Sequence, residues 1–192
     1  MRNVLCWTVA NMALWTGLSA GAYGAEPGEG KDMDKYTVAA YYFPQWHVEP
    51  RNEAAHGVGW SEWKSLREAK PRFPGHVQPK VPLWGEGNEA DPKVFAKKID
   101  AAADHGVDVF LFDWYYTDKG PFLARALEEG YLGAPNNDRV KFAIMWANHG
   151  LYFAPDGKPD GTPERVRGAV SRETFDAMTD HIVEDYLSLI HI

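Results

Sequence analysis

The stretch VDVFLFDWY, residues 107–115, decides the fold class of this chain. Its nearly continuous apolar and aromatic residues predict a strand covered on both faces, as in parallel sheets. An earlier stretch, Val38 to Phe43, is rich in β-branched and aromatic residues and predicts another strand. A later stretch, Val140 to Asn148, predicts a third. The chain therefore carries at least three strands that a sheet can bury.

Helices are predicted between these strands. Asp91 followed by Pro92 is typical of an N-cap with proline at the first helical position, and Gly106 suits the C-terminal end. A second helix is expected over residues 121–129, closed by Gly130. These two helices would connect the first strand to the second and the second to the third.

A third helix is expected after Ser171, which can cap it. Its apolar face would hold Phe175, Met178, Ile182 and Tyr186. Strand and helix thus alternate three times, which predicts an α/β fold with a parallel sheet and right-handed crossovers. A closed eight-unit barrel needs about 250 residues. Three units are either a small open sheet or the first part of a (β/α)8 TIM-type barrel.

Composition excludes several classes of protein. The chain has 192 residues, of which 45% are hydrophobic, which suits one packed domain. Its net charge is −7 and no cluster of basic residues stands out, so a nucleic-acid partner is not expected. Cys6 is the single cysteine, which excludes a disulfide scaffold and a thiolate zinc site. Aromatic residues make up 14%, and this enrichment favours a large core or a site that grips a ligand by its faces.

The two ends of the chain differ from its middle. Residues 1–22 have the basic start, apolar run and small-residue site of a signal peptide, which predicts a secreted or periplasmic protein without stable membrane insertion after cleavage. A membrane anchor is the alternative. Residues 23–35 are expected to be a linker, and residues 36–186 the folded part. LSLIHI at 187–192 matches the translation of a sequencing-library adapter. We therefore expect the natural sequence to stop at Tyr186 and the gene to be truncated. An ordinary apolar helix end is the alternative.

The carboxyl ends of the predicted strands are where the active site of either architecture would lie. Each end brings aromatic residues together with a hydrogen-bonding group. Sugars are recognised in this way, with C–H faces on aromatic rings and hydroxyls held by polar groups. The candidate substrate-binding residues are Tyr42, Gln45, Trp46, His47, Trp60, Glu62, Trp63, Asp113, Trp114, Tyr115, Trp146, Asn148 and His149.

Structural roles compete with this interpretation. Trp114 and Trp146 could equally be core residues. The side chains of residues 148–149 could serve only to form hydrogen bonds within the turn that follows the strand. Glu62 could be a first-turn acid that interacts with a helix dipole. Asp113 interrupts an apolar run and has no capping role, which favours a site. Accordingly Glu62, Asp113, Trp114, Trp146 and Asn148 are predicted to converge on one concave rim. The sequence lacks HExxH, a phosphate-binding glycine loop and GxSxG, so no metal or cofactor is expected.

Four segments, in this order and without repeats, resemble one known family. They are YYFPQWH at 41–47, GWSEWKSLREAKPRFPGHVQPKVPL at 59–83, GVDVFLFDWYY at 106–116 and MWANH at 145–149. The chain resembles the glycoside hydrolase family 99-like domain, also called the WbsX-type domain. The resemblance implies a (β/α)8 barrel of more than about 300 residues, of which this chain is the N-terminal part.

The resemblance also implies a chemistry. Family 99 enzymes cleave α-mannosidic bonds with retention, through attack by the sugar's own 2-hydroxyl, without a metal. The catalytic glutamate is expected on a later Trp-Asn-Glu-Trp segment that this chain lacks, so the fragment would be inactive. Among its residues Glu62 and Asp113 are the candidates for catalysis.

An exported glycoside hydrolase acting on mannose-containing glycans is the favoured function, because a nucleotide-sugar donor is cytosolic. A WbsX-type glycosyltransferase and a non-catalytic carbohydrate-binding domain are the alternatives. The exact glycan and the oligomeric state stay open.

Overall fold

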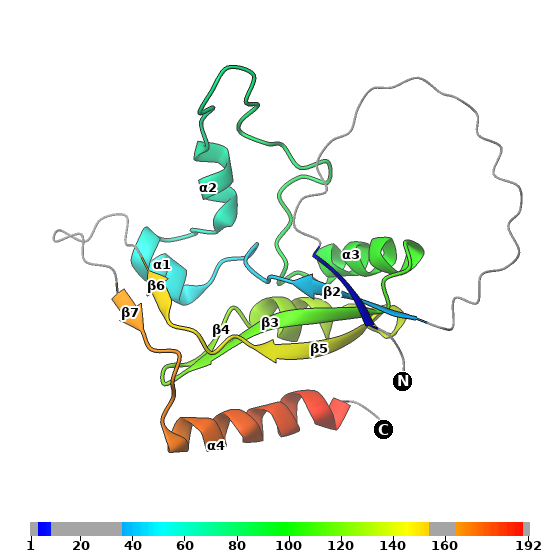
Figure 1. Ribbon diagram of the computed structural model, residues 1–192, viewed down its shortest axis with the longest axis vertical. Coiled ribbons are helices and arrows are strands. Elements are labelled where there is room, and N and C mark those ends of the chain that lie inside the picture. The colour runs from blue at the N-terminus through cyan, green and yellow to red at the C-terminus, as the bar shows by residue number, and fades with distance from the viewer. Residues whose placement is uncertain (1–3, 9–35, 154–163, 190–192) are drawn as a thin grey trace, which may run out of the picture.

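A computed structural model describes residues 4–8, 36–153 and 164–189 of this chain. Its main feature is a sheet in which four parallel strands lie in the order β1-β2-β3-β5 (Figure 1). The strands are β1 (Val4–Thr8), β2 (Thr37–Tyr42), β3 (Val109–Thr117) and β5 (Lys141–Trp146). The last three are the strands that the sequence predicts, and their parallel pairing confirms the α/β class.

β1 comes from the stretch interpreted as a signal peptide and pairs in parallel with β2. The rest of that stretch and the linker at 23–35 lie outside the described residues. At the other end, a 3-10 turn, η5 (Leu187–Leu189), forms half of the stretch interpreted as adapter-encoded, and residues 190–192 lie outside the described part.

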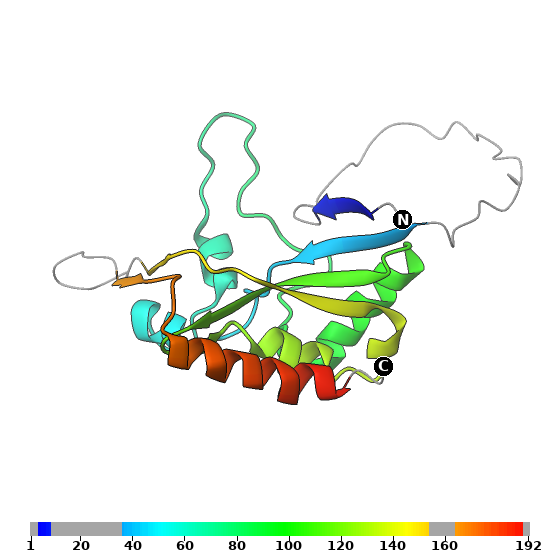
Figure 2. The ribbon, with the colours of Figure 1, turned by 60° about the horizontal axis from the view of Figure 1, so that its bottom comes forward.

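Helices cover one face of the sheet (Figure 2). They are α3 (Pro92–Asp104), the π-helix η2 (Ala126–Tyr131), and α4 (Arg172–His181), which continues as the π-helix η4 (Ile182–Tyr186). α3 and α4 begin where the sequence predicts. The side chains of Asp91 and Ser171 accept hydrogen bonds from the backbone N–H groups of Lys93 and Thr174, as N-caps do.

The predicted helix over residues 121–129 is wrong in its first half. Residues Gly120–Phe122 form a short strand, β4, which pairs antiparallel with the end of β3. The helix begins only at Ala126, and Gly130 lies inside it. A Cβ atom on Gly130 would lie 1.9 Å from the carbonyl oxygen of Glu89. This glycine is therefore required by a close backbone approach and does not mark a helix end.

The core lies between the helices and one face of the sheet. Along β3, Phe110, Phe112 and Trp114 are buried against the helices, and the intervening residues are only half-buried. On the helix-free face Tyr41 and Met145 are each 36% exposed. Within the described residues, helices therefore cover only one face of β3, and the unbroken apolar run of its sequence does not reveal which face that is.

The long connection between β2 and α3 lies beyond the carboxyl end of β2. It contains α1 (Pro50–His56), which was not predicted from the sequence, and α2 (Glu62–Glu68), whose first turn holds Glu62. Residues 69–85, which we call the arm, then run without helix or strand away from the sheet (Figures 1 and 2).

The remaining elements are small. A 3-10 turn, η3 (Asn137–Arg139), precedes β5. An antiparallel hairpin of β6 (Leu151–Phe153) and β7 (Glu164–Val166), not expected from the sequence, follows it. Across the described ranges, no helix combines the length and the apolar character needed to cross a membrane.

Candidate functional site

Asp113 lies near the carboxyl end of β3, on the face of the sheet that carries no helix. Burial raises the pKa of its carboxyl group, and the charge of His149 partly offsets this. Tyr115, two residues along the same face, has its pKa raised to about 12 by burial and by the charge of Asp113. Its ring meets those of His149 and Phe43 edge-on, with centroids 5.8 and 6.4 Å apart. We call Phe43, Asp113, Tyr115 and His149 the Asp113 cluster.

A second cluster surrounds Glu62 in the first turn of α2. The side-chain amide of Gln45 donates a hydrogen bond to Oε1 of Glu62. Burial raises the pKa of Glu62, while the charge of His56 and hydrogen bonds from Gln45 and Ser65 lower it by less. His56 stacks on Trp60 with ring centroids 4.4 Å apart.

We call Gln45, His56, Trp60 and Glu62 the Glu62 cluster. It is linked to the Asp113 cluster by the short segment from Phe43 to Gln45, in which the N–H of Gln45 donates to the carbonyl of Phe43. Both clusters therefore belong to the carboxyl-end side of the sheet. Trp46 and Trp63, whose rings are 4.2 Å apart, lie beside the Glu62 cluster, and both side chains are half-buried.

Three predicted site residues lie instead on the helix-covered face. Trp114 is 2% exposed, and its indole N–H donates to the hydroxyl of Tyr186 over 2.8 Å. Tyr42 packs on Phe112 with ring centroids 4.9 Å apart. Trp146, opposite Trp114 in the sheet, donates to the carbonyl of Tyr116 over 3.3 Å. The alternative that these residues belong to the core is the one their surroundings favour.

The predicted convergence on one rim is therefore wrong for Trp114 and Trp146. Because side chains alternate along a strand, Trp114 points to the opposite face from its neighbour Asp113. Asn148 is exposed in the turn after β5, and its N–H donates to the carbonyl of Trp146 over 3.1 Å. It remains on the rim side with His149, which is also exposed and lies 5.8 Å from Tyr115 between ring centroids.

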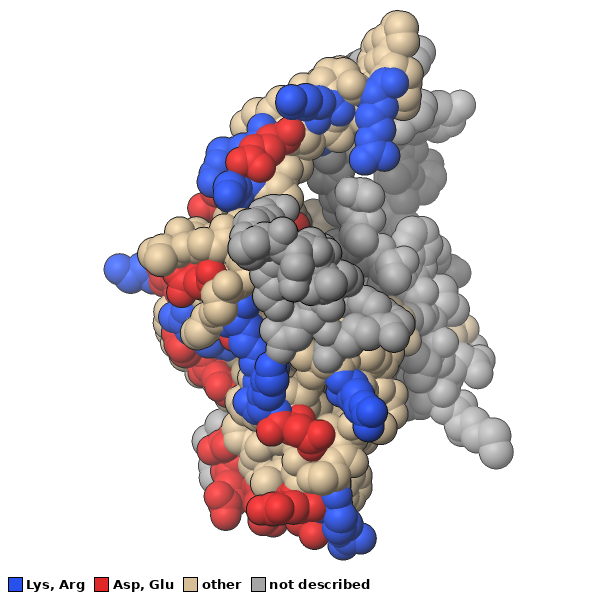
Figure 3. All heavy atoms as spheres, turned by 90° about the vertical axis from the view of Figure 1, so that its left-hand side faces the viewer, with Lys and Arg blue, Asp and Glu red and all other residues tan. Residues whose placement is uncertain are grey.

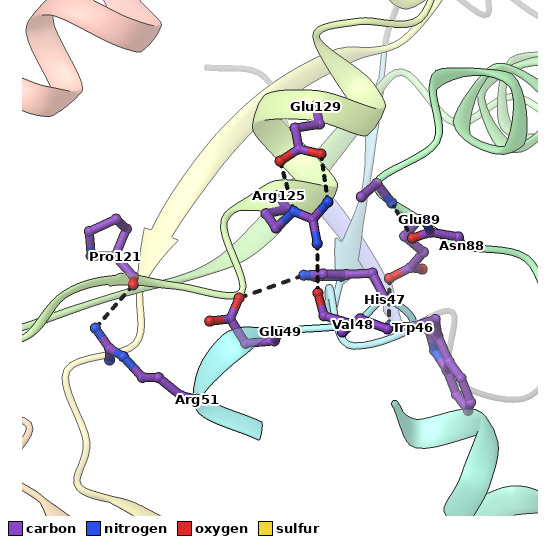
Figure 4. A network of polar contacts seen from close by, with 11 residues as sticks. Trp46, His47, Val48, Glu49, Arg51, Asn88, Glu89, Pro121, Arg125 and Glu129 are labelled. Atoms are coloured by element: carbon purple, nitrogen blue, oxygen red, sulfur yellow. Dashed lines mark hydrogen bonds and ion pairs between the residues drawn. The ribbon is translucent and has the colours of Figure 1, made fainter. Parts of the chain in front are cut away.

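The loop after β2 is held in place by the buried carboxylate of Glu89 (Figure 4). Glu89 is 1% exposed, accepts a hydrogen bond from the N–H of Trp46 over 2.9 Å, and forms an ion pair with Lys98 at 2.5 Å. The hydroxyl of Tyr42 also donates to it. The loop that carries Gln45 is thus fixed by a residue more than forty positions away, for which the sequence offers no local signal.

His47 lies in the loop after β2, with its ring pointing toward Glu49 (Figure 4). It is 1% exposed, its Nε2 is 3.9 Å from Oε2 of Glu49, and neither ring nitrogen makes a hydrogen bond within the described residues. Burial lowers the pKa of His47 and raises that of Glu49. Arg125 donates to the carbonyl of Val48 over 2.8 Å and pairs with Glu129. His47 is therefore placed to support the loop and lies out of reach of a ligand on the surface.

The two clusters provide carboxyl groups that burial makes easier to protonate, next to aromatic rings and amide or imidazole groups. Such a set can hold hydroxyl groups and donate or accept a proton. In the described residues no group of three or more His, Cys, Asp or Glu side chains is arranged to hold a metal ion.

Comparison with known proteins identifies a family for this chain. The family described as Glycosyltransferase WbsX matches residues 38–160, more than half of the chain, and this range contains both clusters. The chain belongs to the WbsX family.

Two curated relatives are similar to this WbsX-family chain. Both are described as an uncharacterized protein WxcX, from Xanthomonas campestris pv. campestris strains B100 and ATCC 33913. Each is 30% identical over 123 residues, which are 64% of this chain and 17% of the relative. The chain thus spans less than a fifth of the length of these relatives. No solved structure matches the chain.

Proposed function

We propose that the protein hydrolyses glycosidic bonds in mannose-containing glycans and that this chain supplies much of the substrate-binding rim. The observation that carries the proposal is the placement of two carboxyl groups, Glu62 and Asp113, among aromatic, amide and imidazole groups on the carboxyl-end side of the sheet, where burial raises the pKa of each. A glycosidase needs a carboxyl group that stays protonated near its working pH to protonate the leaving oxygen, and burial is how enzymes obtain one.

The surroundings of the two carboxyl groups suit a sugar. Tyr41 and Phe43, at the end of β2, are 36% and 47% exposed, and they offer ring surface on which the C–H face of a pyranose can lie. Gln45, Asn148 and His149 can hold hydroxyl groups. On this proposal Asp113 binds and orients a substrate hydroxyl, and Glu62, held by Gln45, either does the same or takes part in proton transfer. Neither role needs a metal or a cofactor.

We also propose that β2, β3 and β5 are the first three strands of a (β/α)8 barrel. They are parallel, they lie side by side in the sheet in the order in which they occur along the chain, and α3 and η2 from their connections lie on one face. The helix-free face would then line the interior of the barrel, and Asp113 would lie at its carboxyl-end mouth, where barrel enzymes keep their active sites.

Glycosyl transfer is the second candidate, and the family's description as a glycosyltransferase favours it. A transferase for a nucleotide-sugar donor must hold a diphosphate, for which Arg and Lys groups are the usual ligands. The arginines next to the rim, Arg51 and Arg125, are occupied with backbone carbonyls and carboxylates. This occupation is why we place hydrolysis first.

The deciding experiment uses the full-length protein with α-mannan and mannose-containing oligosaccharides. New reducing ends released without any nucleotide sugar are the expected result. Chain extension that depends on a nucleotide-sugar donor would establish the transferase instead. Binding of the glycan without either reaction would make the domain a non-catalytic carbohydrate-binding one.

Export is part of the proposed function, and it rests on the signal-like pattern of residues 1–22. A polymeric glycan outside the cytosol is accessible to an exported hydrolase, whereas a nucleotide sugar is not. Fractionation of cells that produce a C-terminally tagged protein tests this. We expect the tag in the periplasm or medium, and a cytosolic tag would contradict export.

A further inference from the structure

The arm, residues 69–85, differs in charge from the rest of the molecule. It contains the basic residues Lys70, Arg72 and Lys80 and no acidic residue, although the whole chain carries a net charge of −7. The charged groups of Lys70 and Arg72 are exposed. Figure 3 looks onto the carboxyl-end side and shows blue Lys and Arg side chains on the projecting part at the top. The arm is thus a basic projection from an acidic molecule.

Two aromatic rings of the arm are exposed on one side and supported on the other. Phe73 is 63% exposed and stacks on His76, with ring centroids 4.6 Å apart and planes within 11°. Trp84 is 51% exposed, and the ammonium group of Lys97 lies 4.4 Å from its ring centroid. A ring that is held on one side and open on the other is a platform for a flat ligand, because little further ordering is needed when the ligand binds.

The returning half of the arm adds an apolar stripe. Along residues 76–83 exposure alternates from one residue to the next, and Val77, Val81 and Leu83 are 66%, 87% and 97% exposed. Pro79 and Pro82 remove backbone donors, so this segment is a poor template for an added β-strand. Its exposed surface consists of side chains and suits a ligand that itself presents C–H groups.

The arm is anchored next to the Glu62 cluster. The indole N–H of Trp63 donates to the carbonyl of Gly87 over 2.9 Å, and Arg67 pairs with Glu86. Both ends of the arm are therefore fixed to α2, the helix whose first turn carries Glu62. A ligand that lies along the arm can continue to the rim only if it is a chain of several units.

We propose that the arm is a second carbohydrate-binding surface, for the distal part of an anionic polysaccharide whose scissile bond lies at the rim. The basic groups fit carboxylate-bearing sugars, and the open rings and apolar stripe fit their C–H faces. This inference rests on the proposed function for the identity of the substrate. An anionic bilayer fits less well, because a flat membrane would face much of the acidic body, whereas a flexible chain needs to contact only the arm and the rim.

The test is affinity electrophoresis of the full-length protein in gels that contain alginate, an anionic polymer, or α-mannan, a neutral one. We expect retardation by alginate that weakens as salt rises. The double variant K70Q/R72Q should weaken alginate binding about three- to tenfold, which is about 0.7–1.4 kcal/mol at about 1.4 kcal/mol per tenfold and lies within the range for two exposed ion pairs. The matched control K93Q/K141Q removes two exposed lysines elsewhere and should leave the binding unchanged.

Further variants separate this proposal from the proposed function. Trp84→Ala should weaken alginate binding without changing the near-ultraviolet signal of the core. Glu62→Gln should leave arm binding intact, even though it lowers turnover in the full-length protein. Equal weakening by K70Q/R72Q and by K93Q/K141Q would overturn the proposal. So would binding to phosphatidylglycerol vesicles but not to alginate, which would assign the arm to a membrane, and so would binding to α-mannan alone.

Discussion

Asp113 is the residue whose position most directly links the sheet to the proposed chemistry. In the full-length enzyme, Asp113→Ala should lower turnover of an α-mannan substrate at least about tenfold, because a hydrogen bond to a charged group contributes about 1.5 to 3 kcal/mol. Initial rates at low substrate concentration measure this as kcat/KM. Glu173→Ala, an exposed acid on α4, is the control. Unchanged kinetics in a variant that keeps its aromatic circular dichroism would leave Asp113 without a role in the reaction.

Glu49 carries a prediction about pH. Its side chain is 6% exposed, and burial raises its pKa. A carboxyl group with a raised pKa in the folded state favours folding below the pKa of the unfolded chain and loses that contribution as pH rises through the folded value. Glu49→Gln removes this loss. The variant should therefore gain stability relative to the parent as pH increases from about 4, the ordinary carboxyl range, and the gain should level off at higher pH.

Urea unfolding of the full-length parent and of its Glu49→Gln variant at a series of pH values measures the difference in their free energies of unfolding. Glu68→Gln, at an exposed position of α2, provides the comparison and should give a flat difference. The same pH profile for both substitutions would contradict the prediction that burial of Glu49 makes the stability of the fold depend on pH.

At the scale of elements, the loop after β2 depends on Glu89. This carboxylate is 1% exposed and holds Trp46, Tyr42 and Lys98 together. Glu89→Ala should lower the free energy of unfolding by about 2–4 kcal/mol, because it leaves a partly buried ammonium and a backbone N–H without their partner. Glu86→Ala, which breaks the exposed pair with Arg67, should cost less than about 1 kcal/mol.

Denaturant titration of the full-length Glu89→Ala and Glu86→Ala variants compares their free energies of unfolding. The double variant E89A/K98M should recover part of the loss, because it also removes the stranded charge. Equal costs for Glu89→Ala and Glu86→Ala would show that the buried network does not hold the loop.

The contact between η2 and the segment before α3 depends on Gly130. A Cβ atom there would meet the carbonyl of Glu89 at 1.9 Å, so Gly130→Ala should destabilise the fold by about 1–3 kcal/mol despite the better helix propensity of alanine. Gly150→Ala is the control, since its nearest neighbour would be the carbonyl of Val166 at 3.5 Å, and it should be nearly neutral. Thermal melts of both variants test this, and equal melting temperatures would contradict it.

The elements that the sequence predicts well are those with a strong local pattern. β2, β3 and β5 are long apolar runs, and α3 and α4 carry capping residues before an apolar face. The prediction for residues 121–129 is wrong in its first half because Pro121 suits a first helical turn as well as an edge strand, and pairing with β3 favours the strand. The hairpin of β6 and β7 is short and has no such pattern.

The candidate site was predictable only in part, for a related reason. The positions of Glu62, Asp113 and His149 just beyond strands or in the first turn of a helix follow from the strand pattern. The face of Trp114 does not, because VDVFLFDWY lacks the polar alternation that would separate its two faces. The role of Glu89 could not be predicted from the sequence, because it arises from contacts with residues far away along the chain.

At the scale of the whole molecule, the helix-free face of the sheet predicts how the chain behaves alone. Tyr41, Phe43 and Met145 leave apolar surface open there. Losing several burials of about 1.5 to 3 kcal/mol each can exceed the stability of a domain. The chain expressed without residues 1–22 should therefore aggregate or form a molten species without glycosidase activity. Size-exclusion chromatography and near-ultraviolet circular dichroism measure this. A monodisperse monomer with a cooperative melt would contradict it.

The anchoring of the arm has a consequence for how such proteins diversify. Because the ion pair of Arg67 with Glu86 and the hydrogen bond from Trp63 to Gly87 close the arm at its root, the residues between them can change in length or composition without moving Glu62. Loop length alters closure entropy only slowly. On the proposal that the arm binds a polysaccharide, mutation can therefore change which polymer it accepts while Glu62 keeps its place, so that ligand preference and reaction can evolve independently.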